Sequence, residues 1–441
     1  MRDRKRKADV VIIGGGASGL AAAIELGMRA PQLSVLVIEK MPEPARKIRA
    51  TGSGRCNIMN TGAEGFSRIM SFFRETGLVT RTYEDGLVYP YSESAADVAE
   101  LLVKRAEALG VKLACGEEVI SVKTAAEAVA EAGNEAEAGD EAGRFIVTSV
   151  FKGAGGEQRI TTAADYAVLA CGGKAGPSYG TTGDGYRLAR ELGHSIVTPV
   201  PALTGIECRE WDEGEEPCGI TLGGTRSRGV VSLYRDSSGG FGEETKLFEE
   251  AGEIQFTKYG LSGICVFNMT RFMRFDKAAG ESLDDFLIRL DLFPDGSIAE
   301  YIEDRQKGAF ADAGPDELLC TILKKPLAAY AAGRYRAMRA SEPGDDDGGR
   351  DGGIDIQLMQ RAVHGLEFHP VRLRGWKDAQ VTMGGVSLDE IDGATSESKL
   401  AEGLYITGEL ADRDFMCGGF NLSNAWLTGL AAADDIAGRS R

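Results

Sequence analysis

Three glycines near the amino terminus have the spacing of a phosphate-binding turn: Gly14, Gly16 and Gly19 form G-x-G-x-x-G. The apolar, β-branched run 10–13 precedes them, and good helix formers fill residues 20–28. In such a strand–turn–helix unit the first glycine permits the turn, the second lets backbone approach a pyrophosphate, and the third lets helix pack on strand. The helix start offers free N–H groups to phosphate. The remaining residues of the predicted turn are Gly15, Ala17 and Ser18.

An acidic residue follows at the distance that a dinucleotide site requires. Residues 33–38 form a second apolar run, and Glu39 stands at its end, 20 residues beyond Gly19. An acid in this place accepts hydrogen bonds from ribose hydroxyls. The motif does not distinguish FAD from NAD, because both contain the same adenosine-diphosphate half.

Composition narrows the classes of protein that remain. The chain has 441 residues, enough for two or three domains, and a net charge of −17, which argues against a nucleic-acid groove or an anionic membrane surface. Its 8 cysteines include no C-x-x-C pair, so a flavin–disulfide reductase and a clustered metal site are not expected, and the three histidines lack metal-ligand spacing. The basic start (residues 2–7) reads as a solvated tail rather than a signal peptide, because Asp9 and the nucleotide turn follow it. With no apolar stretch of membrane-spanning length, a cytoplasmic protein is expected.

A basic, glycine-containing loop follows the second strand. Residues 40–57 contain Lys40, Arg46, Lys47 and Arg55 together with Gly52 and Gly54, and end in Cys56-Asn57. The loop either contacts the cofactor, with cations near phosphate or flavin, or is a solvated basic segment. These residues alone do not decide between the two.

Residues 46–57, RKIRATGSGRCN, resemble the RK-x-x-x-SGGGRCN segment of the bacterial HI-0933-like flavoproteins, a family of FAD-dependent oxidoreductases. Residues 85–111 resemble the family's GR-x-F-P-x-S segment and the helix after it, with Leu87 and Tyr89 in place of Arg and Phe. Residues 379–430 resemble its T-x-GGV … GE-x-x-D … GGYN ending, with departures at Cys417, Phe420 and Thr428. The resemblance implies non-covalent FAD.

The resemblance also implies which residues contact that cofactor. It favours the hypothesis that the basic loop contacts the cofactor, and it makes Lys47 the one catalytic candidate. Further contacts are expected from the backbone near Val119, from the turn Cys171-Gly172-Gly173, from Gly408-Glu409 and from Gly418-Gly419-Phe420-Asn421. Asn421 is predicted to cap a final helix whose positive end faces the flavin ring.

The predicted fold class is α/β, a Rossmann-like two-segment FAD-binding domain interrupted by an inserted mixed β/α domain. The expected boundaries are 1–195 and 376–441 for the FAD-binding domain and 196–375 for the insertion. Ser94 is predicted to cap a helix over 95–109, and residues 283–290 and 315–340 are predicted to be helical. The Ala/Glu/Gly-rich stretch 124–143 is predicted to be a detached tip.

These features predict an oxidoreductase that transfers hydride between flavin N5 and a small or medium-sized organic substrate. No second G-x-G-x-x-G unit is present, so the reductant is left open between transiently bound NAD(P)H and another donor. One alternative is an oxidase of small amines or amino-ketones that uses O₂. Another is a non-catalytic FAD-binding accessory protein. A small-molecule partner, no nucleic acid and no metal are expected, and the sequence does not indicate an oligomeric state.

Overall fold

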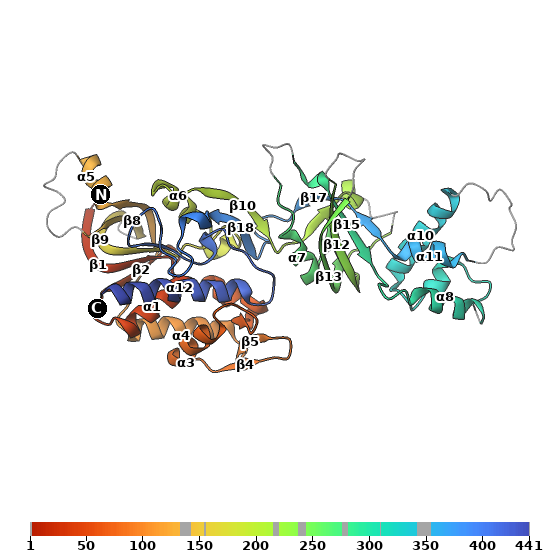
Figure 1. Ribbon diagram of the computed structural model, residues 1–441, viewed down its shortest axis with the longest axis horizontal. Coiled ribbons are helices and arrows are strands. Elements are labelled where there is room, and N and C mark those ends of the chain that lie inside the picture. Colours follow the sequence, from red (N-terminus) through yellow and green to blue (C-terminus); the bar gives the residue numbers. More distant parts are fainter. Residues whose placement is uncertain are drawn as a thin grey trace. The chain divides into compact units, whose positions relative to one another are not determined.

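The computed structural model describes residues 2–132, 143–153, 156–214, 220–236, 244–275, 281–308, 310–341 and 354–440. The chain forms two compact units (Figure 1). Unit 1 combines Met1–Pro201 with Gln380–Arg441, and unit 2 is Ala202–Ala379. The predicted fold class is confirmed, because unit 1 is a mixed α/β unit built from two segments and interrupted by unit 2.

The main sheet of unit 1 has seven strands in the order β6-β2-β1-β9-β8-β7, with β19 also pairing with β9. Strands β1, β2, β6, β9 and β19 pair in parallel, whereas β8 is antiparallel to both β7 and β9. The strands are β1 (Arg2–Ile13), β2 (Val35–Glu39), β6 (Lys112–Cys115), β7 (Glu117–Thr124), β8 (Phe145–Gly153), β9 (Gly156–Leu169) and β19 (Leu404–Ile406).

Strand β1 begins earlier than the sequence predicts. Residues 2–7, expected to be a solvated tail, pair with β9 in parallel register. Arg6 explains part of this extension, because its guanidinium donates to Thr162 Oγ1 on β9 and pairs with the buried carboxylate of Glu117 on β7. These residues are therefore part of a strand and not a tail, although Arg4, Lys5 and Lys7 are exposed to solvent as predicted.

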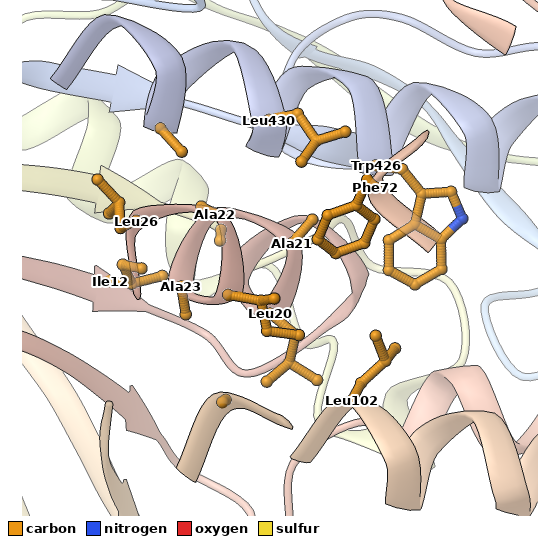
Figure 2. Close-up of a cluster of buried hydrophobic side chains, with 14 of the residues drawn as sticks. Ile12, Leu20, Ala21, Ala22, Ala23, Leu26, Phe72, Leu102, Trp426 and Leu430 are labelled. Carbon is orange, nitrogen blue, oxygen red and sulfur yellow. The ribbon is translucent and has the colours of Figure 1, made fainter. Parts of the chain in front are cut away.

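The two faces of the sheet carry separate cores, as alternation along a strand requires. Val10 and Ile12 belong to the core that includes side chains of α1, α3, α4 and α12, and Val11 and Ile13 belong to the opposite core with residues of α6. In Figure 2, Trp426 and Leu430 extend from α12 towards the small side chains of α1. The helices of unit 1 are α1 (Ala17–Arg29), α2 (Arg46–Ala50), α3 (Phe66–Thr76), α4 (Ala95–Ala108), α5 (Ala125–Ala132), α6 (Asp184–Glu191) and α12 (Phe420–Arg439).

Helices α1 and α12 approach closely because their contact is made of small residues. A methyl group placed on Gly429 of α12 would lie 2.2 Å from the Ser18 carbonyl oxygen on α1. Gly429 therefore fixes the last helix of the chain directly against the first one, next to the glycine turn.

Two local predictions in unit 1 concern a helix cap and the tip. Ser94 caps α4 as predicted, its hydroxyl accepting from the Asp97 N–H at 3.3 Å. Within the predicted tip, Ala125–Ala132 form the helix α5, because alanine and glutamate favour a helix. Detachment of this segment from the core stays a prediction. Residues 133–142 of that tip lie outside the described residues.

Two small sheets complete unit 1. One has the antiparallel order β3-β5-β4, formed by β3 (Met59–Asn60), β4 (Thr80–Thr82) and β5 (Leu87–Pro90). The other pairs β10 (Ile196–Ala202) with β18 (Val381–Val386). None of the helices in the described part of the chain is long and apolar enough to cross a bilayer.

Unit 2 contains an antiparallel sheet of order β16-β15-β12-β13-β14-β11-β17 and a set of helices. The predicted helix over 283–290 is wrong beyond a short turn, because Phe286, Ile288 and Leu290 are buried at every second position of β15. The strands are β11 (Ile206–Cys208), β12 (Arg226–Asp236), β13 (Glu244–Phe256), β14 (Gly260–Ser262), β15 (Phe286–Asp291), β16 (Leu366–Phe368) and β17 (Pro370–Leu373). The helices are α7 (Ile264–Thr270), α8 (Ile298–Gln306), α9 (Pro315–Leu319), α10 (Lys325–Ser341) and α11 (Ile356–Val363).

Candidate functional site

The glycine turn between β1 and α1 has a different constraint at each glycine. Gly14 is in the left-handed region (φ +107°), and a methyl group there would lie 2.4 Å from the Ala170 carbonyl oxygen. A methyl group on Gly19 would lie 2.0 Å from the Gly14 carbonyl oxygen. A methyl group on Gly16 would meet no described atom within 4 Å. Gly14 and Gly19 are therefore required by the fold, whereas Gly16 leaves space beside the amino end of α1.

That space fits a dinucleotide phosphate. Gly16 is the residue before α1, and no side chain of the described structure caps this helix end. The first turn of α1 also contains no acidic residue. The N–H groups at the helix start and the positive end of the helix dipole thus suit an anion.

Glu39 lies against the same turn. One carboxylate oxygen accepts from the Gly15 N–H at 2.8 Å, and the other accepts from the Met41 N–H, also at 2.8 Å. The carboxylate is therefore held at the end of β2 beside the turn, where the sequence predicts a ribose contact.

The basic loop is attached to the turn by its backbone. The Ala45 N–H donates to the Gly15 carbonyl oxygen at 2.8 Å, and the Pro44 side chain fills the space over Gly15. Helix α2 starts immediately afterwards, which places Arg46 and Lys47 at the turn. Arg46 Nε is buried and has no hydrogen-bond acceptor among the described residues, so a cofactor oxygen would satisfy it.

The next residues of the loop have an unusual backbone. Gly52, Ser53 and Gly54 have φ of 57°, 56° and 87°, and Cys56 has φ 59°. Two non-glycine residues in the left-handed region within four positions cost free energy, of order 1–3 kcal/mol each, and such strain concentrates at ligand sites. Burial raises the pKa of the Cys56 thiol to about 11, so this side chain stays neutral.

Four segments that are distant in sequence meet at Glu409. The Lys47 ammonium donates to one Glu409 oxygen at 2.7 Å, and the Thr382 N–H donates to the other at 2.9 Å. Thr382 Oγ1 in turn accepts from the Lys174 N–H at 2.7 Å. A methyl group on Gly173 would lie 2.6 Å from Glu409, so the turn after β9 needs glycine there.

Gly408 and the last glycine pair are also held closely. Gly408 is left-handed (φ +67°), lies against Ser18, and donates its N–H to Thr428 Oγ1. A methyl group on Gly419 would lie 2.7 Å from the Met59 backbone and 3.0 Å from Asn57 Oδ1. That Asn57 oxygen is buried without a donor among the described residues, which again leaves a polar atom for a ligand.

Asn421 does not cap the final helix, so that prediction is wrong. Helix α12 begins at Phe420, and the residue before it, Gly419, is left-handed and has no side chain to offer. The Asn421 amide instead binds the preceding loop, accepting from the Phe415 N–H at 2.9 Å and donating to the Phe415 carbonyl oxygen at 2.7 Å.

The remaining predicted residues have other partners. The Lys40 ammonium donates to Thr182 Oγ1 at 2.6 Å and pairs with Asp184, while Arg55 is exposed over the Tyr89 ring. Val119 is buried in β7. Gly116, just before this strand, donates its N–H to the Met41 carbonyl oxygen. Burial raises the pKa of Cys171 to about 12, and left-handed Gly172 (φ +68°) follows it.

Sequence reasoning missed Thr382 and Ala45. Thr382 belongs to the T-x-GGV segment, and its type and place in that segment were the available signal. Ala45 carries no chemical signal, because only its left-handed backbone (φ +61°) and its N–H serve the site.

A two-segment Rossmann-type unit with a glycine turn, an acid at the end of β2 and converging glycine loops has the geometry that suits a dinucleotide. Residues 8–67 and 65–435 match the family model described as "HI0933-like protein Rossmann domain". The chain belongs to the HI0933-like family.

Named relatives align with nearly the whole chain. The 3-dehydro-bile acid delta(4,6)-reductase of Clostridium scindens is 30% identical over 451 residues, covering 97% of this chain and 98% of the relative. The ribosomal RNA dihydrouridine synthase of Haemophilus influenzae is 25% identical, and that of Escherichia coli is 23% identical, with the same coverage. The protein is an FAD-dependent oxidoreductase.

Proposed function

We propose that this enzyme reduces a carbon–carbon double bond conjugated to a carbonyl group in a small or medium-sized organic molecule, with NAD(P)H as the reductant. The structural observation that supports it is the geometry of unit 1, where Gly16 leaves space at the start of α1 and Lys47 and Thr382 both contact Glu409. The direction of the reaction follows the names of its relatives, a delta(4,6)-reductase and dihydrouridine synthases, which both describe adding hydrogen to a double bond.

The proposed cofactor contacts divide along the FAD molecule. The turn from Gly14 to Gly19 and the start of α1 would hold the pyrophosphate, and Glu39 would hold the ribose. The strained loop 52–57 and Gly418-Gly419 would lie towards the flavin. Once bound and reduced by NAD(P)H, FAD would supply hydride at N5, a carbonyl conjugated to the double bond would take up the negative charge that develops, and a proton from water would complete the saturated product.

Lys47 is proposed to act by charge and position. Its ammonium and the Glu409 carboxylate form a pair whose side chains are 29% and 18% exposed. Screening by water is weaker there than at an open surface, so a cation at this place favours electron-rich states of the site. Glu409 is held on its other oxygen by Thr382, which keeps the Lys47 ammonium in one place.

A small substrate is proposed over an RNA because of charge. The chain has 67 acidic and 50 basic residues, and RNA binding relies on clusters of basic side chains that neutralise phosphates. The competing enzyme function is an amine oxidase. An oxidase would pass electrons from the amine through the flavin to O₂, whereas the proposed reductase passes them from NAD(P)H to the double bond.

The deciding experiment follows the flavin without and with oxygen. Holoenzyme reduced anaerobically with NADPH or NADH should be reoxidised by a 3-keto-4-ene steroid, and deuterium from the labelled nicotinamide should appear in the saturated product. Aminoacetone should not reduce the flavin. Reduction of the flavin by aminoacetone with oxygen uptake, or reoxidation only by ribosomal RNA, would contradict the proposal.

A further inference from the structure

We propose that the outward face of the β3-β5-β4 sheet binds the reduced nicotinamide dinucleotide that delivers hydride to this enzyme. The face, called here the Tyr–Arg face, rests on the proposed function, which makes NAD(P)H the reductant. It consists of Arg55, Arg81, Tyr83, Tyr89, Tyr91 and Glu93.

Aromatic rings and guanidinium groups alternate on this face. Arg81 on β4 stands opposite Tyr89 on β5, so their side chains share one side of the sheet. The Arg81 guanidinium lies over the Tyr91 ring, 4.3 Å from its centroid, and Arg55 lies 5.2 Å from the centroid of Tyr89. Tyr83 meets Tyr89 edge to face at 5.5 Å. Such a surface suits a planar base joined to phosphate.

The face is accessible. Tyr91 is 61% exposed, and one side of its ring is taken by Arg81, which leaves the other side for a base. The side chains of Arg55 and Arg81 are 57% and 42% exposed. Tyr83 is also exposed, whereas Tyr89 is buried beneath Arg55 and Tyr83.

The arginines keep donors available for phosphate. Each lies near Glu93, but the closest N···O separations are 3.9 Å for Arg55 and 3.8 Å for Arg81, longer than a hydrogen bond. The Tyr83 hydroxyl donates to the Glu93 carboxylate instead. Two acids, Glu84 and Asp85, lie in the turn between β4 and β5, and the Asp85 carboxylate accepts from the Leu87 N–H. Arg81 also donates to the Tyr83 hydroxyl at 3.5 Å, but a guanidinium carries five N–H donors, so both arginines keep donors for an incoming pyrophosphate.

The face also borders the loops proposed to lie towards the flavin. A methyl group on Gly52 would contact the Tyr89 ring at 3.5 Å, and one on Gly418 would contact Leu87 of β5 at 3.6 Å. The Asn60 amide on β3 donates to the Gly418 carbonyl oxygen at 3.1 Å. Figure 1 shows β4 and β5 near the end of unit 1 where α12 begins.

The sequence explains why a surface site is needed. It contains one G-x-G-x-x-G turn, and the proposed FAD occupies it. A nicotinamide dinucleotide must then bind without its own Rossmann turn. Hydride passes from C4 of the dihydronicotinamide to flavin N5, which leaves an oxidised pyridinium to dissociate. The Tyr–Arg face only binds and orients the donor.

The test measures binding apart from turnover. FAD-loaded enzyme is titrated calorimetrically with tetrahydro-NADPH and tetrahydro-NADH, which cannot donate hydride, and NADPH or NADH reduction is followed anaerobically by stopped flow. Tyr91→Ala and Arg81→Ala should each raise Kd about tenfold, and Tyr91→Phe should stay within about twofold of the parent protein. The control variants are Tyr301→Ala, an exposed tyrosine on α8, and Arg144→Ala, an exposed arginine just before β8 that pairs with Glu402.

Each result decides between the two proposals. An unchanged Kd in both Tyr91→Ala and Arg81→Ala, with the parent flavin still reduced by NADPH or NADH, overturns the docking site and leaves the proposed function standing. A parent flavin that dithionite reduces and neither nicotinamide reduces overturns both the reductant and this inference. If Tyr91→Ala loses its thermal transition, Arg81→Ala carries the test. Binding of a single-stranded RNA but no dinucleotide to the face would also overturn it.

Discussion

Replacing Gly16 by valine should empty the cofactor site without unfolding the protein. Gly16 has φ −82° and ψ −163°, an extended backbone that any residue adopts, and a methyl group there meets no described atom within 4 Å. The fold should therefore tolerate the larger side chain, with a change in the free energy of unfolding of about 1 kcal/mol or less. The same volume would stand between the backbone and a pyrophosphate. Losing two charge-assisted hydrogen bonds, each worth about 1.5–3 kcal/mol, should weaken FAD binding at least about 100-fold.

Two other glycines provide matched comparisons for this prediction. Gly19→Ala should destabilise the fold itself, because its methyl group would lie 2.0 Å from the Gly14 carbonyl oxygen. Gly333→Ala on α10, where a methyl group meets nothing within 4 Å, should leave stability and FAD content intact. The assay is the FAD-to-protein ratio after desalting, the Kd for FAD added to apoprotein, and the melting temperature of the apoprotein. Stoichiometric FAD with an unchanged Kd in Gly16→Val would refute the reasoning.

Three further predictions concern charges and thiols. Lys47→Met should lower the flavin midpoint potential by about 30 mV and change stability by about 1 kcal/mol, whereas Lys47→Arg should keep the potential of the parent protein. Equal potentials of Lys47→Met and the parent protein in a dye-linked titration would remove Lys47 from the site. Burial lowers the pKa of His194 below its ordinary value of 6.5 and outweighs the hydrogen bond that the Glu390 carboxylate accepts from its ring, so the folded state resists protonation and stability should be lost as pH falls below 6.5. His194→Gln should flatten the melting temperature between pH 7.5 and 5.5, and parallel slopes would contradict this. Cys56 and Cys171, whose thiols have pKa values of about 11 and 12, should resist iodoacetamide at pH 8 until the protein is unfolded, as peptide mapping would report, while exposed Cys320 reacts.

The cofactor turn could be predicted because its requirements are local. Gly14, Gly16 and Gly19 act through backbone conformation and the absence of a side chain, and both follow from spacing in a strand–turn–helix unit. Glu39 is similarly fixed by its place at the end of a strand. These features do not depend on which distant segment packs against them.

Other features depended on tertiary partners that the sequence does not name. The basic residues 2–7 look unsuited to a strand until β9 provides pairing along their whole length and Glu117 accepts Arg6. The run 283–290 has no helix partner but lies between β12 and β16, which turns its alternating apolar residues into a strand. Asn421 has the right type for a cap, but the backbone of Gly419 places the helix start two residues earlier.

The contact of α1 with α12 has a consequence for synthesis of the protein. Gly429 lies against Ser18, and β19 enters the sheet beside β9, so elements made last complete the unit begun first. A nascent chain leaving the ribosome must release all of unit 2 before Glu409 can reach Lys47 or α12 can cover α1. Until then the apolar side of α1 lacks Trp426 and Leu430, and the site lacks its final glycine loop. We therefore expect cofactor capture to follow translation of the second segment, and a fragment that ends before residue 380 to lack flavin and to expose this helix.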